Sequence, residues 1–173
     1  MTTNIDTWKY NDYPNLVSLF ESAEKNFADN PLFGIKNKNG VYEWVTYKQV
    51  GDRIRHFRGG LAKLGVTKGD RVGIISKNQT EWLVAEMAAL GLGAWLVPMY
   101  EKELVSVWQY TIEDAGCKIL LVSTPEIFEK VKDFPDKIDA LEQIILIDGS
   151  GKGSMNFYEN LGRKNPVETM YPD

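Results

Sequence analysis

Hydrophobic positions recur at spacings of four and three residues between residues 46 and 64, which is the period of an amphipathic helix. The apolar stripe consists of Val50, Ile54, Phe57, Leu61 and Leu64. Thr46 and Gln49 stand three residues apart and predict a capping box at the amino end of this helix. Gly65 follows the stripe, where helices commonly end in the left-handed conformation.

A second pattern of short apolar runs alternating with helical stretches fills the rest of the chain. The strands are predicted at residues 71–75, 94–97, 118–122 and 143–148. The helices between them are predicted from Asn78 to Leu90, through 104–112 and from Pro125 onward. Such alternation predicts an α/β fold, a mostly parallel sheet flanked by helices on both faces.

Single residues predict where these elements begin and end. Asn78 and Glu81 can form a capping box for the helix after the first strand. Pro98 is expected to end the second strand because it has no N–H for the ladder. Helix 104–112, with apolar positions at Leu104, Val107, Trp108 and Ile112, should break at Gly116.

The amino-terminal part has a different pattern. Asn15 can cap a helix with apolar residues Leu16, Leu19, Phe20, Ala23 and Phe27. Two apolar runs at 32–36 and 41–45 then flank Asn39-Gly40, a strong hairpin signal. We therefore divide the chain into a helix plus hairpin (14–45), an α/β core (46–148) and a polar linker (149–173).

Several short motifs occur along the chain in one order and spacing. They are 45–50 (Val-Thr-Tyr-Lys-Gln-Val), 64–66 (Leu-Gly-Val), 68–72 (Lys-Gly-Asp-Arg-Val), Asn78, Glu81-Trp82, Gly93-Ala94 and Val97-Pro98. This set resembles the N-terminal part of the adenylate-forming, AMP-binding enzymes. The run 42–47 is most similar to acyl-CoA synthetases of the long-chain fatty acid type.

The resemblance implies a carboxylate–CoA ligase that uses a fatty acid, ATP, Mg²⁺ and CoA. Residues 1–173 would form the N-terminal portion of the large domain, with 149–173 leading towards the phosphate loop. That Ser/Thr/Gly-rich loop and the later catalytic lysine have no counterpart in these 173 residues. We therefore expect no catalytic or metal-binding residue here, no tightly bound cofactor and no activity of the 173 residues alone.

Two groups of alternatives remain open. Within the family, the parent protein could be an aryl-CoA ligase or a peptide-synthetase adenylation domain. Outside it, the chain could be a non-catalytic α/β module for binding or dimerisation. A flavodoxin-like nucleotide domain is disfavoured because Ser76-Lys77-Asn78 after the first parallel strand offers no glycine.

The loop that leaves the second strand is the candidate for a functional site. Ligands of open α/β sheets bind outside the carboxyl ends of the strands. The resemblance places this loop beside the pantetheine and acyl acceptor. The candidate residues for that wall are Pro98, Met99, Tyr100, Glu101 and Lys102. The acidic and basic residues at 101–103 depart from the small or proline-rich residues of relatives.

Three other candidate motifs lack the residues or the surroundings that their chemistry requires. A phosphate loop at 148–154 would need glycine where Leu146 stands and Ser or Thr where Gly153 stands. His56 lies among three arginines, which oppose a further positive charge. Cys117 sits at a helix–strand junction without a neighbouring histidine in the sequence, so we do not expect a nucleophile.

The composition limits which binding partners and which cellular location we expect. A net charge of −4 gives no electrostatic reason to expect nucleic acid. No run is long and apolar enough for a membrane span, and no signal peptide opens the chain. We expect a cytoplasmic protein, with peripheral membrane attachment of the full-length enzyme left open. An unpaired sheet edge at 143–148 would favour a homodimer.

Overall fold

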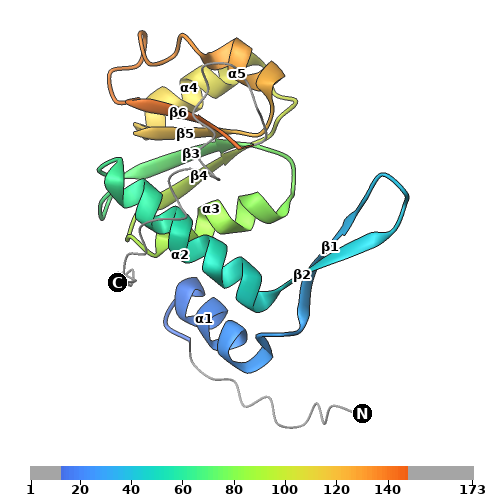
Figure 1. Ribbon diagram of the computed structural model, residues 1–173. Coiled ribbons are helices and arrows are strands. Elements are labelled where there is room, and N and C mark those ends of the chain that lie inside the picture. Colours follow the sequence, from blue (N-terminus) through green and yellow to red (C-terminus); the bar gives the residue numbers. More distant parts are fainter. Residues whose placement is uncertain (1–12, 148–173) are drawn as a thin grey trace.

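The computed structural model describes residues 13–147 and shows a helix, a projecting hairpin and an α/β layer structure (Figure 1). Helix α1 spans Leu16–Phe27. Asn15 caps it, as predicted, because the Ser18 N–H donates to Asn15 Oδ1 at 2.9 Å. The predicted apolar face is only partly correct. Val17 is the buried residue of α1, whereas the side chains of Leu16 and Leu19 are 53% and 44% exposed.

The hairpin predicted around Asn39-Gly40 is confirmed. Strands β1 (Pro31–Lys36) and β2 (Tyr42–Thr46) pair antiparallel. The Asn37 side chain holds the turn, since its Oδ1 accepts the N–H groups of Asn39 and Val41, each at 3.0 Å. Gly40 adopts the positive φ of 79° that the turn needs. In Figure 1 the two strands extend away from the rest of the chain.

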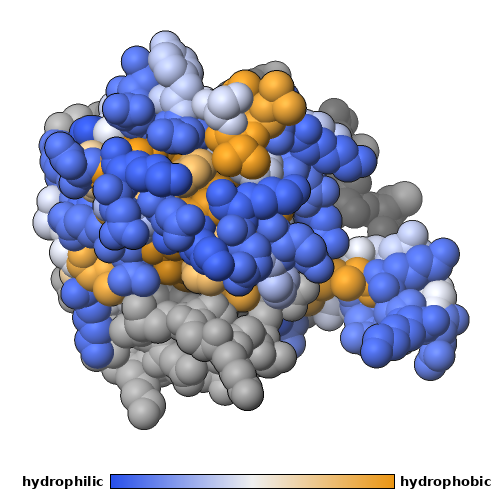
Figure 2. Space-filling model, turned by 90° about the horizontal axis from the view of Figure 1, so that it is seen from above, coloured by the Kyte–Doolittle hydropathy of each residue, from blue (hydrophilic) through white to orange (hydrophobic). Residues whose placement is uncertain are grey.

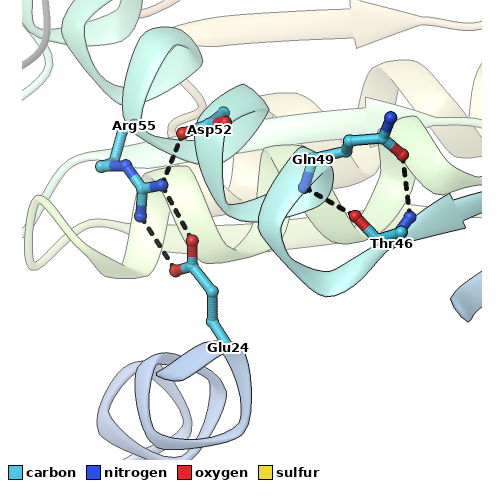
Figure 3. A network of polar contacts seen from close by, with 5 residues as sticks. All are labelled: Glu24, Thr46, Gln49, Asp52 and Arg55. Carbon is cyan, nitrogen blue, oxygen red and sulfur yellow. Dashed lines mark hydrogen bonds and ion pairs between the residues drawn. The ribbon is translucent and has the colours of Figure 1, made fainter. Parts of the chain in front are cut away.

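Helix α2 (Tyr47–Lys63) begins with the predicted capping box (Figure 3). The Gln49 N–H donates to Thr46 Oγ1 at 3.3 Å, and the Thr46 N–H donates to Gln49 Oε1 at 2.9 Å. The predicted stripe faces the core. Its buried members are Val50, Ile54, Phe57 and Leu61. Gly65 follows with a φ of 77°, so the left-handed end of the helix is confirmed.

An ion pair joins α1 to α2. Arg55 donates two hydrogen bonds, of 2.8 and 2.9 Å, to the two carboxylate oxygens of Glu24 (Figure 3). Asp52 Oδ1 accepts a third bond from Arg55 at 2.7 Å. The hydrogen bond to Glu24 is the main cause that raises the pKa of Arg55 above its usual value. Gly51 leaves room for this pair, because a Cβ there would collide with the Glu24 carboxylate.

Four parallel strands form the sheet, in the order β4-β3-β5-β6. The strands are β3 (Arg71–Ile75), β4 (Trp95–Met99), β5 (Ile119–Val122) and β6 (Gln143–Leu146). The helices that connect them are α3 (Thr80–Leu90), α4 (Val105–Ala115) and α5 (Pro125–Val131). The predicted parallel sheet is therefore confirmed.

Each face of the sheet has its own hydrophobic core. One core joins α2 and α3 to the side chains of Val72 and Ile74. The other joins α4 and α5 to Ile75, Leu120 and Val122. Figure 1 shows α2 and α3 on one side of the sheet and α4 and α5 on the other. The predicted flanking of both faces is thus confirmed.

Two predicted helix starts need correction. Asn78 does not cap α3, because the extended residue Gln79 occupies the N-cap position and makes no side-chain capping bond. The amide of Gln79 instead donates to Ser76 Oγ at 3.1 Å. Helix α4 begins one residue after Leu104, which is 70% exposed. Gly116, with a φ of 63°, ends α4 as predicted, and Pro125 opens α5 as predicted.

Pro98 does not end its strand, because β4 continues to Met99. The Trp95 N–H donates to the Asp70 carbonyl at 2.8 Å, so Trp95 points its backbone groups toward β3. Successive residues of a strand alternate in direction, and this places the missing N–H of Pro98 on the open side of β4. An edge strand tolerates proline there.

Among residues 13–147, no helix combines the length and the hydrophobicity needed to cross a bilayer. Strands β4 and β6 are the two edges of the described sheet. The linker at 149–173 and the glycine-rich motif at 148–154 lie outside the described residues.

Candidate functional site

Three loops leave the sheet at the carboxyl ends of β3, β4 and β5. These strands run parallel, with Ile75 opposite Met99 on one side and Val122 on the other. The loops therefore start side by side at one edge of the sheet. The chain passes from β3 to one neighbour, β4, and then crosses to the other, β5. That reversal makes the end of β3 a topological switch point, where open α/β sheets bind ligands.

The end of β4 and the loop after it hold the five residues that the sequence singled out, and the structure separates them into two groups. Met99 is 9% exposed and packs into the hydrophobic core with Ile75 and Trp108. Four are at least partly accessible: Pro98, Tyr100, Glu101 and Lys102. Tyr100 is 57% exposed, so its ring is free to contact a ligand. Met99 attaches this group to the hydrophobic core.

The backbone of this loop is fixed by Trp108 of α4. The indole Nε1–H of Trp108 donates to the Tyr100 carbonyl at 2.9 Å, and Trp108 is 1% exposed. The Glu103 N–H donates to the same carbonyl at 3.3 Å. Lys130 Nζ of α5 lies 6.0 Å from the Trp108 ring centroid, within cation–π range. The buried Trp108 ring thus holds the backbone of Tyr100, and the Lys130 ammonium group lies beside that indole.

Sequence reasoning missed the buried hydroxyl groups that follow the two central strands. Ser76 comes directly after β3 and Ser123 directly after β5, and they are 6% and 1% exposed. The Ser123 N–H donates to the Ile75 carbonyl at 3.0 Å, which continues the pairing of the strands. Ser123 Oγ has no hydrogen-bond partner among the described residues. A hydroxyl directly after a buried strand is the signal that could have found them.

Cys117 and His56, two side chains weighed for catalysis from the sequence, lie outside the three loops. Cys117 is fully buried, and burial raises the pKa of its thiol to about 11, against a smaller lowering by Arg71. Such a thiol is protonated at neutral pH and is a poor nucleophile. His56 is half-buried on α2 and lies outside the three loops. Within residues 13–147, no three His, Cys, Asp or Glu side chains gather as metal ligands.

Comparison with known proteins gives a family match over residues 19–170, to the AMP-binding enzyme family. A long-chain-fatty-acid–CoA ligase of Mycobacterium bovis is 31% identical over 160 residues, which are 91% of this chain and 26% of that protein. Fatty acyl-CoA synthetase A of Dictyostelium discoideum is 28% identical over 162 residues, 84% of this chain and 24% of that protein. The chain thus spans about a quarter of the length of these relatives.

A solved structure of an anthranilate CoA ligase in complex with anthranoyl-AMP has a similar fold. Its TM-score is 0.76 at 20% sequence identity, over 90% of this chain and 28% of that one. At this identity the likeness concerns the fold alone. The arrangement of helix, hairpin and parallel sheet is therefore that of the N-terminal region of adenylate-forming enzymes.

Proposed function

Because this chain belongs to the AMP-binding enzyme family, we propose that it supplies the N-terminal scaffold of an ATP-dependent fatty acid–CoA ligase. In this reaction a carboxylate attacks the α-phosphate of ATP, and pyrophosphate leaves. The CoA thiol then attacks the acyl carbonyl and AMP leaves. The observation that carries the proposal is the family match over most of the chain, together with relatives named as fatty acyl-CoA ligases.

The described residues would act as a structural scaffold and would form one wall of the CoA site. They present four accessible residues at the carboxyl edge of the sheet, Pro98 at the end of β4 and Tyr100, Glu101 and Lys102 in the loop after it. We assign these residues, anchored by Met99, to the CoA side of the site. Mg²⁺ supplies charge stabilisation to the phosphates in such ligases. The part of the chain that the structure describes offers no ligand cluster for that ion. The 173 residues hold no counterpart of the family's Ser/Thr/Gly-rich loop or later lysine, and for this reason we expect them to be inactive alone.

The proposed wall is tested by measuring how the reaction rate depends on CoA concentration. The sample is the protein encoded by the complete reading frame, up to its stop codon. Tyr100→Ala should raise KM for CoA several-fold and leave KM for the carboxylate unchanged, because the ring is exposed beside the acceptor side. Lys38→Ala, in the hairpin turn, is the control and should change neither. Equal changes in both KM values would remove the assignment of Tyr100 to the CoA side.

A panel of acids tests the substrate class. Fatty acids are expected as substrates because the relatives are named for them. Aryl acids and amino acids in the same panel address the other adenylate-forming activities. A preference for benzoate or for an amino acid would contradict the fatty acid proposal while leaving the family intact.

A non-catalytic binding module is the second candidate, favoured by exposed aromatic and aliphatic residues. Trp44, Trp95, Leu104 and Tyr110 are each more than 60% exposed. Side chains of this kind are enriched in protein interfaces. Sedimentation of the 173-residue chain addresses it. A monomer at all concentrations would argue against the dimer that we predicted from the sheet edge.

A further inference from the structure

Trp108 belongs to the hydrophobic core beneath α4, yet its one polar group bonds to the loop after β4. The ring is 1% exposed and packs among the apolar side chains on the α4 and α5 side of the sheet. Its indole N–H donates to the Tyr100 carbonyl at 2.9 Å. A buried indole N–H needs a hydrogen-bond partner. The position of the ring in the core and the position of this carbonyl are therefore tied together.

The same residue holds both ends of the loop, which runs from Tyr100 to Leu104 between β4 and α4. The indole holds the Tyr100 carbonyl, and the backbone N–H of Trp108 donates to the Leu104 carbonyl at 3.1 Å. Inside the loop, the Glu103 N–H donates to the Tyr100 carbonyl at 3.3 Å. Trp108 therefore fixes where the loop begins and where it passes into α4.

The side chains of the loop itself contribute little packing. Tyr100 and Leu104 are 57% and 70% exposed, and Lys102 and Glu103 are exposed as well. Segments with few buried contacts are the ones that open most easily. The conformation of this loop therefore depends on the hydrogen bonds that Trp108 supplies from the core.

Trp108 is too deeply buried to contact a ligand directly. Seen from above, the surface formed by α4 and α5 is largely hydrophilic with smaller hydrophobic areas (Figure 2). The Trp108 ring is 1% exposed, and Lys130 of α5, which is exposed, lies with its Nζ 6.0 Å from the ring centroid. Any influence of Trp108 on a ligand must therefore pass through the residue that it holds, Tyr100.

We propose that Trp108 is a positioning residue for the second half of the ligase reaction, in which the CoA thiol attacks the acyl carbonyl and AMP leaves. It acts by holding the backbone of Tyr100, whose exposed ring we assign to the CoA side of the site. This inference rests on the proposed ligase function and goes beyond it, because it gives a core residue a role in one half-reaction. Adenylate formation, which comes before CoA reacts, does not depend on it.

The effect is expected in KM for CoA and not in kcat. A binding surface that is already held in one conformation avoids the free-energy cost of ordering it when the ligand binds. Loss of that advantage weakens CoA binding equally in the ground state and in the transition state, which raises KM and leaves kcat unchanged. One hydrogen bond contributes roughly a two- to tenfold factor. The bond from Glu103 remains, so we expect a rise of about threefold.

The substitution Trp108→3-benzothienylalanine tests the bond in the protein encoded by the complete reading frame. This side chain has the shape of tryptophan with sulfur in place of the indole N–H, so it removes the donor and keeps the volume. It should raise KM for CoA about threefold and leave kcat and KM for the carboxylate unchanged. An unchanged KM for CoA would overturn the proposal. A fall in kcat with equal rises in both KM values would overturn it too, since that is the result of general structural damage.

The same substitution at Trp95 is the matched control. Trp95 lies at the start of β4 and is 65% exposed, so the change there should leave every kinetic constant as in the wild type. Thermal unfolding checks that both variants are folded at the assay temperature. Equal rises in KM for CoA at the two positions would contradict the proposal, because the effect would then not come from the buried hydrogen bond.

A double variant shows whether Trp108 acts through the ring of Tyr100. Tyr100→Ala removes the ring and keeps the carbonyl that accepts the bond. In this background the substitution at Trp108 should bring no further rise in KM for CoA, because the loop no longer carries the side chain that contacts CoA. Two effects that add independently would contradict a coupling between these residues.

ATP–pyrophosphate exchange separates this inference from the proposed function. The wild type and the Trp108 variant should exchange at the same rate, because the adenylate forms without CoA. No exchange in the wild type would contradict the ligase function and with it this inference. Equal exchange together with equal KM values for CoA would leave the ligase function intact and overturn only the role of Trp108. A loss of exchange in the variant alone would also overturn that role, since Trp108 would then serve both half-reactions.

Discussion

The indole N–H of Trp108 donates a hydrogen bond of 2.9 Å to the backbone carbonyl of Tyr100 and so fixes the loop that leaves β4. The ring is 1% exposed and packs with Met99 and Ile75 on the α4 side of the sheet. The conformation of the candidate wall therefore depends on a residue of the core rather than on the loop itself.

Trp108→Phe should lower the free energy of unfolding by about 1–3 kcal/mol, because it removes this hydrogen bond and leaves part of the ring's volume empty. Urea unfolding measures the change. Trp95→Phe is the matched control, since Trp95 is 65% exposed, and it should stay within about 0.5 kcal/mol of the wild type. Equal effects of the two variants would mean that the buried indole does not anchor the loop.

The Glu24–Arg55 pair should contribute measurably to the attachment of α1. Arg55 is 40% exposed and Glu24 14%, so solvent screens the pair, and we expect Glu24→Gln to cost about 1 kcal/mol. Glu129→Gln breaks the exposed pair with Lys132 and should cost less than Glu24→Gln. Thermal unfolding at low and high salt compares them. A cost for Glu129→Gln as large as that for Glu24→Gln would contradict the role of the bidentate geometry.

Gly116 is needed both for its backbone angle and for space. Its φ is 63°, and a Cβ there would lie 2.6 Å from Nη2 of Arg71, whose Nε–H donates to the Ala115 carbonyl. Gly69 has a φ of 87°, but a Cβ added there would meet no atom within 4 Å. Gly69→Ala should therefore cost about 1 kcal/mol from backbone strain, and Gly116→Ala more. Equal costs in urea unfolding would show that Arg71 moves aside freely.

The buried thiol of Cys117 should make stability depend on pH above 9. Its pKa is raised from 9.0 to about 11, so between these values the unfolded chain loses the thiol proton while the folded chain keeps it. The unfolded state then binds fewer protons, and stability falls as pH rises through this window. The stability advantage of the wild type over Cys117→Ala should shrink from pH 9 to pH 11. A constant difference across the window would contradict the raised pKa.

The sequence predicted the elements whose signals are local. The spacing of Val50, Ile54 and Phe57 on α2 marks a face that meets the core, and Asn37 to Gly40 carry their own turn chemistry. Packing between distant segments decided the rest. The periodic residues Leu104 and Val107 are exposed because α4 turns Trp108 and Ile112 inward.

Two further features could not be predicted from the sequence, the burial of a charged side chain and the presence of a proline inside an edge strand. Arg58 is 2% exposed although two arginines and a histidine surround it in the sequence. Its burial follows from the approach of Gly91, at the end of α3, where a Cβ would lie 3.1 Å from Arg58 Nη1. Pro98 continues β4 because its missing N–H faces the open edge of the sheet, a position that only the strand order reveals.

The proposed site was likewise predicted only in part, in its position along the chain but not in the exposure of its side chains. The strand pattern led to the loop after β4, because ligands of α/β sheets lie at the carboxyl ends of strands. It did not distinguish the buried Met99 from the exposed Tyr100.

The most direct test of the ligase proposal is ATP–pyrophosphate exchange with a panel of carboxylates, because exchange reports adenylate formation without CoA. It should be measured in the 173-residue chain and in the reading frame extended through its stop codon. We predict fatty acid-dependent exchange in the extended protein and none in the 173 residues. Exchange by the 173 residues would contradict their assignment as a scaffold, and silence of both proteins would contradict the ligase function.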